Sequence, residues 1–142
     1  MKSDLKIYTS YISAENIERI IKKNYLPLFP IRSIYSSPII GQYSGTAIHL
    51  KELSPSVDLF RSWRGGQTST EDYKKLYALE ILKNVSLEDE IKKLEFLAET
   101  ANAEGVVLLG YSTDPEECHR KIISGLFWGT GTLVNKPEEL VW

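Results

Sequence analysis

The chain has 142 residues, of which 42% are hydrophobic and 25% charged, and its formal net charge is −2. These proportions are those of a globular domain near the commonest domain size, and they argue against an intrinsically disordered chain. The slight negative charge provides no general attraction to nucleic acid or to anionic lipid.

Two strands and a helix are predicted at the beginning of the chain. Residues Leu5–Tyr11 alternate between apolar and polar side chains and are rich in strand-forming residues. Ser13 can cap a helix that follows them, and Asn24 is a plausible end of that helix. Residues Pro27–Ile34 form the second predicted strand, and the two prolines in it favour an irregular start or an edge position.

The middle of the chain is predicted to hold a long loop and then three helices. Residues Tyr35–Leu53 contain two glycines and a proline that indicate a loop, with a further extended piece in Ile39–Leu50. Caps and apolar residues at helical spacing predict helices from Ser54-Pro55 through Trp63, from Thr70 to Lys83 and from Ser86 to Ala103.

The last strand predicted is Gly105–Gly110, whose continuous apolar run is typical of a parallel strand covered on both faces. A helix is predicted from Pro115 to about Trp128, with Asp114 as its cap. Strands that alternate with helices predict a Rossmann-like three-layer α/β fold, in which a small, mainly parallel sheet is flanked by helices. We expect residues 1–142 to form a single domain.

The junction between this strand and helix is the predicted functional site, because open parallel sheets bind ligands at the carboxyl ends of their strands. Free backbone N–H groups at the helix start favour an anion, and Arg120 offers a guanidinium for phosphate or carboxylate. An internal salt bridge of Arg120 to Glu116 or Glu117 is the competing interpretation, and these two carboxylates would also repel an anion.

Cys118 and His119 are the candidate catalytic residues. The helix start can lower the pKa of Cys118 and make it a nucleophile, whereas the alternative is a small half-buried helix residue. His119 is either a general acid or base or a structural histidine. Adjacent Cys-His-Arg residues cannot form a phosphatase-type phosphate loop, and we expect no metal site, since His49 is the only other histidine.

Further ligand-binding candidates lie at or near strand ends. Tyrosines there can place a polar tip against a ligand. The expected ligand-binding residues are Tyr8, Arg32, Tyr111, Ser112, Thr113 and Arg120.

The segment Leu108–Arg120, which reads Leu-Leu-Gly-Tyr-Ser-Thr-Asp-Pro-Glu-Glu-Cys-His-Arg, resembles the closing motif of the family called domain of unknown function 488. That motif reads Leu-Leu-Cys-x-Glu, a spacer and then Cys-His-Arg. The resemblance extends from about Lys6 to Gly125, and it implies an α/β fold with a shared pocket near Arg32 and residues 118–120. Gly110 and Ser112 replace the family's first cysteine and its acidic residue, so chemistry based on a cysteine pair is not expected here.

Three functions are compatible with the sequence. The favoured one is a pocket for an anionic small molecule or a nucleotide; the alternatives are an enzyme with Cys118 as nucleophile and a non-catalytic module for nucleic acid or a protein. Residues 61–64, which interleave Arg and Trp, would serve the last of these. The sequence identifies no cofactor. The charged first residues, the lone cysteine and the lack of a long apolar run predict a cytoplasmic protein without a membrane segment.

Overall fold

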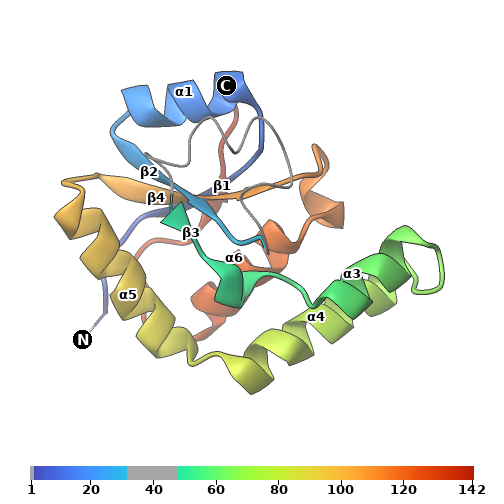
Figure 1. Cartoon of the computed structure of the whole chain (residues 1–142). Coiled ribbons are helices and arrows are strands. Elements are labelled where there is room, and N and C mark those ends of the chain that lie inside the picture. Colours follow the sequence, from blue (N-terminus) through green and yellow to red (C-terminus); the bar gives the residue numbers. More distant parts are fainter. Residues whose placement is uncertain (1, 32–47) are drawn as a thin grey trace.

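The computed structural model describes residues 2–31 and 48–142, and its centre is a parallel β-sheet (Figure 1). The order of the five strands in the sheet is β3-β2-β4-β1-β5. The inner position of β4 explains its apolar sequence, because β1 and β2 pair with it on either side. The strands are β1 (Ile7–Tyr11), β2 (Tyr25–Phe29), β3 (Ile48–His49), β4 (Gly105–Gly110) and β5 (Glu138–Glu139).

Helices cover both faces of the sheet. Figure 1 shows α1 on one face and α4, α5 and α6 on the other, with α3 packed beside α4. A smaller apolar cluster beneath α1 includes Ile17 and Val107, while the larger cluster beneath α4–α6 includes Tyr77 and Leu108. This layering confirms the predicted three-layer α/β fold. The helices are α1 (Ala14–Lys22), α3 (Val57–Arg64), α4 (Thr70–Asn84), α5 (Leu87–Thr100) and α6 (His119–Gly129), with 3₁₀ turns η1 (Lys51–Leu53) and η2 (Pro115–Glu117).

Serine caps fix several helix starts where the sequence predicted them. The Ser13 hydroxyl accepts a hydrogen bond from the backbone N–H of Asn16 at 3.0 Å, and Ser86 accepts one from Asp89 at 3.4 Å. Each cap satisfies one of the N–H groups that a helix start leaves without an internal partner. Both predicted caps are confirmed.

The second strand differs from its prediction. It starts at Tyr25, ahead of Pro27, and it is an inner strand between β3 and β4. Pro27 is tolerated there because β3 pairs only with Leu28 and Phe29. Among the described residues, β4 is therefore the one strand beside Pro27, as at the edge of a sheet. The predicted loop and extended piece between residues 35 and 53 lie largely outside the described residues.

Two helix starts also differ from their predictions. Ser56, rather than Ser54-Pro55, caps α3, and its N–H and hydroxyl both donate to the carboxylate of Glu80 on α4. The predicted helix from Pro115 is wrong in its first turn. Asp114 caps only the 3₁₀ turn η2, and the extended backbone of Cys118 (φ −106°, ψ 141°) then starts α6 at His119. Cys118 is therefore the N-cap residue of α6 and does not lie inside the helix.

No helix in residues 2–31 or 48–142 combines the length and the apolar character needed to cross a membrane.

Candidate functional site

A cysteine–histidine pair lies where β4 leads into α6. The Sγ atom of Cys118 lies 3.8 Å from Nδ1 of His119, and Nε2 of His119 lies 2.7 Å from the carbonyl oxygen of Pro30. A carbonyl can only accept a hydrogen bond, so Nε2 carries a proton. Nδ1 is therefore the nitrogen that can take the proton of the thiol, and the backbone of Pro30 fixes the ring for that exchange.

The environment of Cys118 favours the thiolate. Burial raises the pKa of the thiol, since the side chain is 4% exposed, but other influences outweigh burial. The hydrogen bond to His119 and the charges of His119 and Arg120 lower the pKa, as does the backbone N–H of Arg120, and the result is a pKa of about 6. Cys118 is thus mostly ionised at neutral pH, which is the state in which cysteine acts as a nucleophile.

Arg120 is buried behind the cysteine. Its exposed fraction is 0%, and its guanidinium pairs with both carboxylate oxygens of Glu139 on β5, at 3.1 and 2.9 Å. Its third nitrogen donates to the carbonyl of Ser112 at 2.6 Å. Burial lowers the pKa of Arg120, but Glu139 and Cys118 raise it further, so the charge is retained. The predicted alternative of a salt bridge to Glu116 or Glu117 is corrected: the partner is Glu139, because α6 starts later than predicted and turns Arg120 toward β5.

Gly110, the last residue of β4, makes room for the thiol. A Cβ atom at this position would lie 2.1 Å from Sγ of Cys118 and 3.4 Å from Nη1 of Arg120. Atoms that are not bonded to each other cannot approach this closely, so any side chain here would displace the sulfur. The missing side chain thus allows Cys118 to lie against the end of β4.

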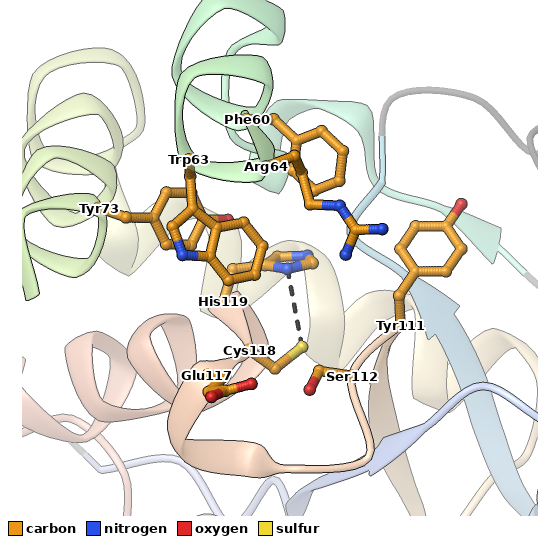
Figure 2. Close-up of a pocket in the computed structure, with 9 residues that line it drawn as sticks. All are labelled: Phe60, Trp63, Arg64, Tyr73, Tyr111, Ser112, Glu117, Cys118 and His119. Carbon is orange, nitrogen blue, oxygen red and sulfur yellow. Dashed lines mark hydrogen bonds between the residues drawn. The ribbon is translucent and has the colours of Figure 1, made fainter. Parts of the chain in front are cut away.

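A cavity of about 580 Å³ opens above Cys118 and His119. Figure 2 shows side chains from α3 and α4 on one side of it and the β4–α6 connection on the other. Trp63 is stacked on Tyr73, with ring centroids 4.5 Å apart and planes 12° apart. The residues that line the cavity are Phe60, Trp63, Arg64, Tyr73, Tyr111, Ser112, Glu117, Cys118 and His119.

The structure brings together only part of the residues predicted to bind ligand. Tyr111 and Ser112 line this cavity with Cys118 and His119, whereas the fully buried Arg120 does not. Thr113 is exposed and lies outside the lining. Tyr8 lines a separate hollow with Lys6 and Glu138, and its ring packs against that of Tyr25, with centroids 4.8 Å apart and planes tilted by 31°.

Two further predictions concern Arg32 and metal binding. Arg32 lies outside the described residues. His49, the other histidine considered for a metal, is hydrogen-bonded to the carbonyl of Ile31. In the described ranges, no three His, Cys, Asp or Glu side chains are grouped so that they could hold a metal ion.

The wall formed by α3 and α4 is the part of the site that the sequence prediction missed. Phe60, Trp63 and Arg64 have helical spacing, so the sequence could have placed them on one face of α3. Tyr73 belongs to the apolar residues at helical spacing that predict the helix from Thr70 to Lys83, and with Tyr77 it resembles a Tyr-x-x-x-Tyr helix of the family. Nothing in the local pattern indicates that this face turns toward Cys118, some fifty residues later in the chain.

Comparison with known proteins gives one family. Residues 10–129 match the family model described as "DUF488-N3a: Active DUF488-N3 subclade". This match confirms the resemblance seen in the closing motif. No curated protein and no solved structure matches the chain.

Proposed function

This chain belongs to the DUF488 family, and on that basis we propose that it is an enzyme in which the Cys118 thiolate attacks a small ligand held in the cavity. The observation that carries the proposal is the Cys118–His119 contact on the cavity wall, together with the thiol pKa of about 6. The matched subclade is described as active, which agrees with a catalytic role.

The chemistry begins with the proton of the thiol. His119 takes this proton on Nδ1, and the imidazolium and thiolate stabilise each other across 3.8 Å. Sγ then forms a bond to an electrophilic carbon of the ligand. The bond from that carbon to the leaving group breaks, and the leaving group departs with the electron pair and takes the proton from His119.

Water completes the cycle. His119 accepts a proton from a water molecule, and the water oxygen attacks the carbon that is bound to Sγ. Sγ leaves with the electron pair of the broken bond, so the thiolate–imidazolium pair is restored. The overall reaction is hydrolysis through a covalent intermediate on sulfur.

The surroundings of the pair support this chemistry. Cys118 is the N-cap residue of α6, and the backbone N–H of Arg120 in the first turn of that helix stabilises the thiolate. The buried Arg120 adds a fixed positive charge that Glu139 and Ser112 hold in place. Low exposure of Cys118 directs access to the sulfur through the cavity.

A simple activated ester tests the proposal. Wild-type protein is mixed with p-nitrophenyl acetate at pH 6.5, and intact-mass spectra are recorded over time. We expect a burst of nitrophenolate, an acetyl group on Cys118, and its loss by hydrolysis, with neither event in Cys118→Ser. An acetyl group that forms equally in Cys118→Ser, or that forms on Cys118 and is never released, would contradict the proposal.

A further inference from the structure

The cavity has one rigid aromatic wall. The indole of Trp63 is held by its stack on Tyr73 and by a hydrogen bond from its Nε1 to the hydroxyl of Thr70 at 3.1 Å. Tyr73 is itself buried and stacked toward Tyr77, so the pair cannot turn away. Figure 2 shows the ring of Trp63 above His119 and Cys118. A fixed aromatic face of this kind binds flat unsaturated rings by stacking.

The cavity also has one cationic end. Arg64 lies at 5.9 Å from the ring of Phe60, and Figure 2 shows its guanidinium on the side of Tyr111. Among the described residues, no carboxylate lies within ion-pair distance of Arg64. Arg64 differs in this from Arg120, whose charge is already neutralised by Glu139. Arg64 is therefore available to an anionic group of a ligand.

The opposite end of the cavity carries negative charge. Glu117 lines it beside Cys118, whose thiolate is already balanced by the imidazolium of His119. A ligand anion would be repelled by Glu117 and attracted by Arg64, because like charges at close range cost energy. The charges thus define one orientation for a ligand that is negative at one end only.

We infer that the ligand is a flat unsaturated ring that bears a single anionic group, a carboxylate or a phosphate. The ring lies against Trp63, the anion pairs with Arg64, and the other end of the molecule reaches Cys118. The inference rests on the proposed function, since it describes the substrate of that site. It adds the chemical class of the substrate and the residues that select it.

Binding is measured in Cys118→Ser, so that the result does not depend on cysteine chemistry. Ligand-detected NMR titrations compare benzoate with neutral benzamide and with the non-planar cyclohexanecarboxylate. Uridine 5′-monophosphate and uridine form the second pair and distinguish phosphate from carboxylate. We expect the planar anion of at least one pair to bind about fivefold more tightly than its neutral partner, and benzoate to bind more tightly than cyclohexanecarboxylate.

Variants of Arg64 and Trp63 test whether these two residues cause the preference for planar anions. Arg64→Gln should weaken binding of the preferred anion about fivefold and leave its neutral partner unchanged. Arg61→Gln is the matched control, because this exposed arginine of the same helix does not line the cavity. Trp63→Leu should weaken the planar probes and remove the advantage of benzoate over cyclohexanecarboxylate.

Three results would overturn the inference: no probe binds up to its solubility limit, charged and neutral probes bind equally, or Arg61→Gln has the same effect as Arg64→Gln. None of these results affects the acetyl transfer test, which reports on Cys118 alone. Failure of that test together with selective binding here would instead leave a binding site without catalysis.

Discussion

Replacing His119 by Gln should make the Cys118 thiol less reactive than wild type at low pH and more reactive than wild type at high pH. Glutamine can still donate a hydrogen bond to the carbonyl of Pro30, as Nε2 of His119 does at 2.7 Å, but it has no base to place against Sγ of Cys118. Burial still raises the pKa of Cys118, but the hydrogen bond and charge of His119 no longer lower it. We expect the pKa to move from about 6 toward the ordinary 9.0.

The size of the effect follows from two opposing quantities. At pH 5.5 a thiol with a pKa of 6 is about 24% ionised, whereas one with a pKa of 9 is about 0.03% ionised. The intrinsic reactivity of a thiolate increases with its pKa, by about 20-fold over this interval. The wild-type thiol should therefore react about 40-fold faster at pH 5.5, and the variant about 15-fold faster at pH 9.5.

The two curves of reaction rate against pH should therefore cross between about pH 5.5 and 9.5. Alkylation by iodoacetamide measures these rates directly, because Cys118 is the only cysteine of the chain. Rates are taken from intact-mass spectra between pH 5 and 10, with circular dichroism to verify the fold. Arg61→Gln is the control, since this exposed arginine of α3 does not line the cavity and should leave the profile unchanged. Profiles of wild type and His119→Gln that run parallel, without crossing, would refute the role given to His119.

Two further predictions concern the groups that hold Cys118. Gly110→Ala places a Cβ atom 2.1 Å from Sγ, so it should lower the free energy of unfolding in urea by about 1–3 kcal/mol and abolish the alkylation inflection near pH 6. Gly125→Ala in α6 is the control: its Cβ meets no atom within 4 Å, so it should leave the stability unchanged or raise it. Equal stability of the two variants would contradict the packing argument. Glu139→Gln leaves the buried Arg120 without its opposite charge and should cost about 3 kcal/mol, while Glu116→Gln, which breaks an exposed pair with Lys121, should cost less than about 1 kcal/mol. A Glu139→Gln protein as stable as Glu116→Gln would show that the buried pair is dispensable.

The sequence by itself determined the features that depend on neighbouring residues. The apolar run Gly105–Gly110 is β4 at the predicted bounds, and Ser13 and Ser86 cap the predicted helices. Capping joins residues three positions apart, and the apolar run marks a strand with neighbours on both faces, so both leave a local pattern. The same reasoning located Cys118 and His119 near a strand end, and the closing motif indicated the family.

Only the tertiary structure decided how these pieces meet. β5 is two glutamates long, so it has no periodicity to detect, yet its Glu139 neutralises Arg120 and accepts a hydrogen bond from Thr9, 130 positions away. The wall of Trp63 and Tyr73 faces Cys118 because α3 and α4 pack near the start of α6. Such contacts depend on the order of strands in the sheet and on which helix face is buried, and these are set by the packing of the whole chain rather than by any local pattern.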